Sequence, residues 1–278
     1  MIAGMIDPMH RYLLAFIKCF HSCEEVKACH QLSWVVDHSS RTNIRAIPPI
    51  AAASIGSISQ MKWLVESLKF PLTNSILRIA VDYGHLSLLI WMSENGFSKM
   101  AHENNTAAIR GHLEILKWFH VKGYIQGERQ DLCVAAASRG HLESLKFLRE
   151  IECKWDKYVV RGGVMSGSLE TVKYCIENGC PCDECCYVAA YYGYMPILQY
   201  LHSIGQSLDG NVFVNAVISG SLEIVEWLHA NNCPYAGFES GIFIAARSRG
   251  YTKILGFLEK SGIISSDVMR EYERRFIV

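Results

Sequence analysis

Eight glycines recur along the chain at a nearly constant spacing, and this period constrains the fold more than any other feature. Successive members lie 26 to 30 residues apart, at Gly56, Gly84, Gly111, Gly140, Gly167, Gly193, Gly220 and Gly250. Each is followed by an amphipathic stretch, most clearly in RGHLEILKWF (110–119), RGHLESLKFL (139–148) and SGSLEIVEWL (219–228). A fixed period of this length indicates a repeat protein, in which each unit buries its apolar face only against its neighbours.

The side chains around each glycine fall into columns that predict two helices per unit. Four positions before the glycine stands alanine in seven units and Gly163 in the other. Apolar residues stand five and eight positions after the glycine, which places them on one helical face. The seventh position is aromatic throughout: Trp63, Trp91, Trp118, Phe147, Tyr174, Tyr200, Trp227 and Phe257. We expect a short helix, a tight turn at the glycine and a second helix of about ten residues, with the aromatic column buried between helix pairs.

Composition and charge limit the classes of partner. The chain has 278 residues, half of them apolar, and its 27 basic residues balance its 27 acidic ones. Without a run of like charge, neither nucleic acid nor a membrane surface is expected as a partner. The apolar stretch YLLAFIKCF (12–20) is interrupted by Lys18 and is shorter than the about 20 residues of a membrane span.

The eleven cysteines, an odd number in a long chain, favour a reducing compartment. We therefore expect a cytoplasmic or nuclear protein that is not secreted. We also expect it to be a monomer.

The repeats resemble the ankyrin family. AAIRGHLE (107–114) and AASRGHLE (136–143) match that family's core, and the resemblance covers about residues 49–264. It implies an all-α protein, an α-solenoid of about eight ankyrin-like helix-turn-helix repeats. These units average about 27 residues instead of about 33 and lack Thr-Pro-Leu-His, so their connectors are shortened. Short repeats of this kind are similar to those abundant in protists and large DNA viruses.

The segment GCPCDECC (179–186) holds four cysteines, including the Cys-x-x-Cys pair Cys182 and Cys185. All four stand in columns that are apolar in other units, and free cysteine behaves as a small buried hydrophobe. A structural zinc site needs four converging ligands, and no second pair lies near in sequence. No strand precedes the pair, as a thioredoxin-like motif would require. The sequence therefore favours packing over a metal or redox site, and the same argument applies to Cys19 and Cys23.

Both ends of the chain differ from the repeats. Residues 1–48 have two interpretations: an N-terminal helical cap with Trp34 in the aromatic column, or a segment that resembles an F-box. We prefer the cap, because solenoids need terminal units with one polar face. Residues 265–278 predict a C-terminal capping helix that starts at Ser265 or Ser266.

Catalytic motifs are missing from the sequence. It contains no Gly-x-Ser-x-Gly, no His-Glu-x-x-His and no phosphate-binding loop. His85, His112 and His141 follow the aligned glycine where serine stands in other units, which suggests hydrogen bonding at a helix start. Gly162 and Gly163 suggest close helix packing. We therefore expect no enzyme activity, no catalytic residue, no cofactor and no metal.

The resemblance also locates a binding face. In ankyrin repeats, the two residues before the Gly-His turn line a concave groove and vary with the partner. Here these positions vary freely, while the position four before the glycine is always alanine or glycine. They include the candidate partner-binding residues Tyr83, Arg110, Arg139, Tyr191, Tyr192 and Arg249. Tyrosine and arginine are enriched at interface hot spots. We expect a scaffold that binds a partner protein, with a ubiquitin-ligase substrate adaptor as the alternative, and a continuous groove formed by Tyr83, Arg110, Arg139 and Tyr192.

Overall fold

The computed structural model describes residues 47–126 and 129–265. Within these ranges the chain is all-helical, with α-helices α3 to α18, one 3-10 helix and no strand. The expected cap or F-box-like segment, except for its last two residues, lies outside the described part of the chain. The C-terminal capping helix, except for Ser265, also lies outside it. Both assignments stay predictions.

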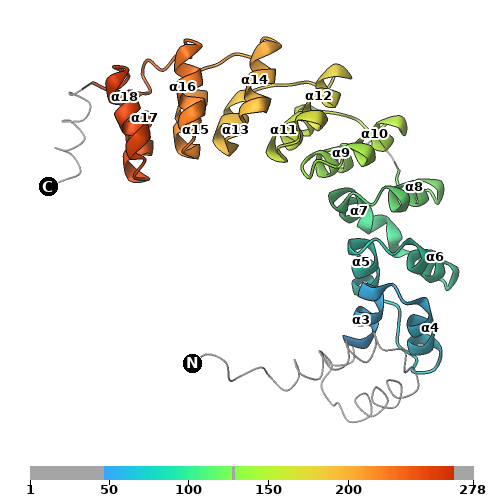
Figure 1. Ribbon diagram of the computed structural model, residues 1–278. Coiled ribbons are helices and arrows are strands. Elements are labelled where there is room, and N and C mark those ends of the chain that lie inside the picture. Colours follow the sequence, from blue (N-terminus) through green and yellow to red (C-terminus); the bar gives the residue numbers. More distant parts are fainter. Residues whose placement is uncertain (1–46, 127–128, 266–278) are drawn as a thin grey trace, which may run out of the picture. The chain divides into compact units, whose positions relative to one another are not determined.

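The helices alternate along the chain as eight pairs (Figure 1). The first helices of the pairs are α3 (Ile47–Ile55), α5 (Asn74–Asp82), α7 (Asn104–Arg110), α9 (Gln130–Ala137), α11 (Lys157–Met165), α13 (Cys185–Tyr192), α15 (Gly210–Ser219) and α17 (Glu239–Ser248). The second helices are α4 (Ile58–Glu66), α6 (Leu86–Glu94), α8 (Leu113–Val121), α10 (Leu142–Glu150), α12 (Leu169–Glu177), α14 (Met195–Ser203), α16 (Leu222–Ala230) and α18 (Thr252–Lys260). The 3-10 helix η2 (Lys99–Glu103) precedes α7. The repeat expected from the sequence is thus observed as one helix pair per glycine.

The chain divides into two compact units, which are described separately. Among the described residues, unit 1 comprises residues 47–107 and 114–124, and unit 2 comprises residues 108–113, 125–126 and 129–265. In unit 1, α3 contacts α4 and α5, and α4 contacts α6. In unit 2, the first helices α9 to α17 contact one another in chain order. They form one layer and their second helices form the other, with the first helices on the inner side of the arc that α9 to α18 make in Figure 1.

The aligned glycines close the first helix of every pair. All eight have a positive φ, between 70° and 79°, which glycine adopts without a steric penalty. At Gly56 the amide N–H donates to the Ala53 carbonyl at 3.2 Å, and the following amide of Ser57 donates to the Ala52 carbonyl at 3.1 Å. This pattern of two hydrogen bonds is a Schellman-type helix end. The tight turn predicted from the sequence is confirmed.

A second left-handed residue closes most second helices, twelve positions after the aligned glycine. It is glycine in five pairs and Asn232 in another, as the sequence suggested. In the fourth pair, however, the residue is Glu152, with φ 63°. A side chain with a Cβ pays a steric cost in this conformation. The sequence contains no signal for this strained position, because glutamate is not a residue associated with helix ends of this type.

Replacement of Glu152 by glycine is expected to raise the free energy of unfolding by about 0.5–1 kcal/mol. The gain is the left-handed strain of about 1–2 kcal/mol minus the extra backbone entropy that glycine loses on folding. The matched control is Glu150→Gly in the last turn of α10, where we expect a loss of about 1 kcal/mol. Urea unfolding measures both variants, and equal destabilisation by the two would contradict the left-handed assignment.

Small residues allow the first helices to pack closely. The alanines four positions before each aligned glycine are fully buried, from Ala52 to Ala246. At Gly162 of α11, an added Cβ would lie 3.1 Å from the Ser138 backbone nitrogen and 3.3 Å from the Val134 carbonyl of α9. The Gly162–Gly163 pair therefore serves close helix packing, as expected from the sequence.

The aromatic column differs from its prediction. Trp91 is buried, with 7% of its surface exposed, whereas the other seven members are only half-buried. The His202 ring lies edge-on to Trp227 at 5.5 Å between centroids, and Lys173 Nζ lies 5.4 Å from the centre of the Tyr200 ring. These contacts join each ring to the preceding second helix. The prediction of a buried column is thus confirmed for Trp91 and wrong for the other seven members, which keep part of their surface in solvent.

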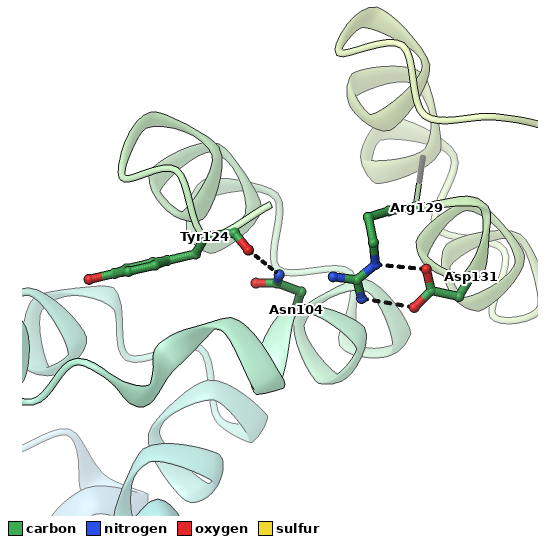
Figure 2. A network of polar contacts seen from close by, with 4 residues as sticks. All are labelled: Asn104, Tyr124, Arg129 and Asp131. Carbon is green, nitrogen blue, oxygen red and sulfur yellow. Dashed lines mark hydrogen bonds and ion pairs between the residues drawn. The ribbon is translucent and has the colours of Figure 1, made fainter. Parts of the chain in front are cut away.

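An asparagine replaces an apolar residue in one core column. Asn104 stands seven positions before Gly111, where Leu77 and Phe213 stand in other repeats, and it is fully buried. Figure 2 shows that its Nδ2 donates to the Tyr124 carbonyl, at 2.8 Å, which joins the start of α7 to the chain after α8. A buried amide needs such a partner, because an unpaired polar group costs free energy in the core.

Candidate functional site

The first helices of unit 2 present one face to solvent. In α11 this face carries Tyr158, Arg161 and Met165, three side chains at positions that share a helical face. All three are exposed, with Tyr158 at 52% and Met165 at 43%. The opposite side of α11 is buried and includes Val160 and the Gly162–Gly163 pair. Aromatic, apolar and cationic groups are therefore held at the surface of a helix whose other side is fixed in the core.

All six candidate partner-binding residues are exposed. Tyr83, Tyr191 and Tyr192 expose 61%, 48% and 42% of their surface, and Arg110, Arg139 and Arg249 are exposed as well. Tyr83 belongs to unit 1, and the other five belong to unit 2. The continuous groove of Tyr83, Arg110, Arg139 and Tyr192 stays a prediction.

Three tyrosines at the end of α13 contact one another. The rings of Tyr191 and Tyr192 lie edge-to-face at 5.2 Å, and Tyr192 is stacked with Tyr194 at 5.8 Å. The Tyr194 ring in turn lies over Gly167, where an added Cβ would be 2.9 Å from Cζ. The missing side chain of Gly167 thus makes room for the ring that supports Tyr192. Side chains held in this way lose less conformational entropy when they bind a partner.

Other exposed groups on the same layer were not selected from the sequence. Tyr158 of α11 and Ile244 of α17 stand nine and six positions before their glycines, and Ile244 exposes 41% of its surface. Arg161 lies over the Tyr187 ring at 5.7 Å from its centre. Met165 and Tyr191 stand two positions before their glycines. Counting back from this position by four or seven residues, in each repeat, would have identified these side chains. The ankyrin resemblance points only to the two residues next to the turn.

Serines in the same variable columns have a structural role. The hydroxyl of Ser138 donates to the Ala135 carbonyl at 2.9 Å, and Ser166 and Ser219 make the same bond to the carbonyl three residues back, each at 2.7 Å. These hydroxyls satisfy carbonyl groups at the helix end. Contact with a partner is therefore expected mainly from tyrosine and arginine in these columns.

His85 and His141, which follow aligned glycines, do not cap their helices. Ser57 and Ser168 accept a hydrogen bond from an amide of the following helix, as capping requires. By contrast, His85 Nε2 donates to the Ser54 carbonyl at 2.9 Å, and His141 Nε2 donates to the Ile109 carbonyl at 3.0 Å. The capping interpretation is thus wrong for these two histidines. The imidazole is longer than a serine side chain and reaches the end of the first helix in the preceding repeat. They join consecutive repeats by hydrogen bonds.

The cysteines of the described chain are almost all buried. Cys180, Cys185 and Cys186 expose 5% or less, which confirms packing for three members of GCPCDECC, while Cys182 is half-buried. The Cys180 thiol donates to the Asp156 carbonyl at 3.2 Å, and Cys233 makes the corresponding bond to Asp209 at 3.3 Å. A cysteine thirteen positions after the aligned glycine therefore joins the end of its repeat to the start of the same repeat.

No group of three or more His, Cys, Asp or Glu side chains gathers as a metal site within residues 47–126 and 129–265. Cys19 and Cys23 lie outside these ranges. The expectations that the protein binds no metal and no cofactor stay predictions.

A polar pocket of about 330 Å³ lies between the starts of α13 and α15. Its lining includes Glu184, Cys186, Tyr187 and Asp209. Asp209 Oδ1 accepts from the Val212 amide at 3.0 Å and caps α15. Burial raises the pKa of Cys186 to about 12, so this thiol stays protonated near neutral pH and is not an activated nucleophile.

An ion pair lies at the start of α9. Arg129 donates two hydrogen bonds of 2.8 Å to the carboxylate of Asp131 (Figure 2). This contact lowers the pKa of Asp131 below its ordinary value and raises that of Arg129. Both charges are satisfied within the first turn of the helix, so the pair has a local structural role.

Comparisons with protein-family models and with curated protein sequences find no match to this chain. Among the described residues, no helix is both long enough and apolar enough to cross a membrane.

Proposed function

We propose that this protein is a non-catalytic scaffold that binds a partner protein through the exposed face of its first helices. The observation that carries the proposal is the set of exposed tyrosine and arginine side chains on that face. Among them, the Tyr191 and Tyr192 rings contact each other, and the Tyr192 ring stacks on Tyr194. Tyrosine and arginine contribute most of the binding energy in many protein interfaces. Single exposed apolar residues are common, but a contiguous aromatic group is typical of an interaction site.

The packing of the first helices supports this choice of face. Their small buried residues allow close approach, and the first helices of unit 2 form the inner layer in Figure 1. In a repeat protein, the inner side of such an arc offers an extended surface to which each repeat contributes side chains. The resemblance to ankyrin repeats makes the same face the binding face. Because the connectors are short, we expect residues on the helices to supply most of the affinity.

The test is a triple variant, Arg139→Ala, Tyr191→Ala and Tyr192→Ala, in unit 2. Partners of the parent protein are captured from a cell lysate and identified by mass spectrometry, and the dissociation constant of a purified partner is then measured by calorimetry. Loss of even one hot spot of about 2 kcal/mol weakens binding about 30-fold, so we expect at least that loss for the triple variant.

The control variant changes three exposed residues of the second helices: Gln199→Ala in α14, Glu226→Ala in α16 and Glu259→Ala in α18. It should bind as tightly as the parent. Circular dichroism shows whether both variants keep their helix content. Full-strength binding by a normally folded triple variant, or equal loss in the control, would refute the proposed face.

The adaptor alternative rests on residues 1–48, of which the described structure includes only the last two. Removal of these residues distinguishes the two functions. An adaptor would lose its ligase subunit and keep its target, whereas a scaffold with an N-terminal cap would keep every partner that binds the repeats.

A further inference from the structure

The cysteines of unit 2 differ in their access to solvent. Seven of the eight described cysteines are buried, and Cys182 is half-buried. A reagent in water reaches a thiol only where its surface is accessible. Among the cysteines that the structure describes, Cys182 is therefore the one that an oxidant reaches without unfolding of the chain.

Cys182 and Cys185 stand three residues apart at the start of α13, and each is the largest influence on the other's pKa. Cys185 is the first residue of α13, and its thiol also donates to the Asp183 carbonyl at 3.4 Å. Between the two cysteines, Glu184 adopts a left-handed conformation with φ 54° and ψ 27°. This residue turns the chain into the helix, and the cysteines on either side of it are free thiols, not joined in a disulfide.

The short repeat explains why Cys182 lies before the helix. Gly167 and Gly193 are 26 residues apart, the smallest spacing in the chain. The helix α13 begins eight residues before its glycine, whereas α11 and α15 begin ten residues before theirs. The first two residues present in those helices, about half a turn, are thus missing from α13. Cys182 stands in the connector, where it keeps part of its surface in solvent.

The two thiols are electrostatically unequal. The neighbouring Cys185 lowers the pKa of Cys182, although burial and the Asp183 carboxylate act in the opposite direction. The same contact and burial raise the pKa of Cys185. Because Cys182 is half-buried and Cys185 is fully buried, peroxide reaches the Cys182 thiol first, and Cys185 is placed to resolve the product.

We propose that Cys182 and Cys185 are a redox modification site at which peroxide forms a reversible intramolecular disulfide. The Cys182 sulfur attacks one oxygen of hydrogen peroxide, the O–O bond breaks, and the product is a sulfenic acid and water. The Cys185 sulfur then attacks the Cys182 sulfur, the S–O bond breaks, and a second water leaves. Overall, two thiols and one peroxide give one disulfide and two waters. A thiol reductant restores the site by supplying two electrons and two protons.

The chain contains an internal control for this site. For Cys133 and Cys153, too, each thiol is the largest influence on the other's pKa. However, they expose 0% and 1% of their surface. If contact between thiols were sufficient, both pairs would oxidise alike. Because access is also needed, only the Cys182–Cys185 pair is expected to react in the folded protein.

The experiment treats the reduced full-length protein with graded amounts of hydrogen peroxide. Free thiols are blocked with N-ethylmaleimide, disulfides are then reduced and labelled with iodoacetamide, and each cysteine is quantified by peptide mass spectrometry. We expect Cys182 and Cys185 to be converted together, as a cross-link within one chain, at least about tenfold faster than Cys133 and Cys153. Dithiothreitol should reverse the reaction, and the preference should disappear in urea.

Three variants separate the roles of the cysteines. Cys182→Ser should abolish the fast reaction, and Cys185→Ser should leave Cys182 as a sulfenic acid that dimedone traps. Cys153→Ser should change neither result. Cross-linking of Cys133 to Cys153 at the same rate in the folded protein would overturn the proposal. So would oxidation of Cys182 without a bond to Cys185.

Discussion

Replacement of Trp91 by alanine is expected to lower the free energy of unfolding by about 3–5 kcal/mol, the range found for large aromatic residues in protein cores. Trp91 exposes only 7% of its surface, and its helix α6 packs against α4 in unit 1. Removal of the buried indole leaves a cavity in the packing around α6. Urea unfolding followed by circular dichroism gives the change.

The control for this prediction is Trp227→Ala, at the same position of another repeat. Trp227 is half-buried, so we expect a loss of about 2 kcal/mol, in proportion to the smaller apolar area removed from water. Trp91→Phe keeps an aromatic ring and should cost less than Trp91→Ala. If Trp91→Ala unfolds at the same urea concentration as the parent, the aromatic column does not stabilise the packing of second helices.

Replacement of Gly111 by alanine is expected to cost about 2–3 kcal/mol, as the sum of a backbone and a side-chain effect. Its φ of 71° adds about 1–2 kcal/mol of strain for a residue with a side chain. In addition, the new Cβ would lie 2.5 Å from Cγ and Nδ1 of His141. The ring must move, and its hydrogen bond to the Ile109 carbonyl, worth about 1 kcal/mol, is lost.

Two further variants isolate these contributions. Gly250 has a φ of 70°, and a Cβ added there would have no neighbouring atom within 4 Å, so Gly250→Ala should show only the backbone strain of about 1–2 kcal/mol. The double variant Gly111→Ala/His141→Ser places a small side chain opposite the alanine, as Ser168 lies opposite Gly140. Its cost should be smaller than the sum of the single changes. Strict additivity would show that the ring and the turn are independent.

Much of the candidate surface could be anticipated from single helices. Tyr83, Tyr191 and Tyr192 are exposed, as their variable columns suggested. Tyr158 and Ile244 were missed, although they lie on the same face by helical period. The support of Tyr192 by Tyr194 and Gly167 could not be foreseen, because the contact joins residues of two repeats.

By itself, the sequence determined the helix pairs, their turns and the buried small-residue column. These features follow from local causes: the helical period of apolar side chains and the freedom of glycine at positive φ. The tertiary structure decided how far each member of a column is buried. Trp91 is enclosed and Trp227 is not, and Cys182 keeps the solvent contact that Cys180 loses. It also decided that His141 bonds to the preceding repeat. Such outcomes depend on the approach of a neighbouring helix, and a pattern within one repeat does not specify that distance.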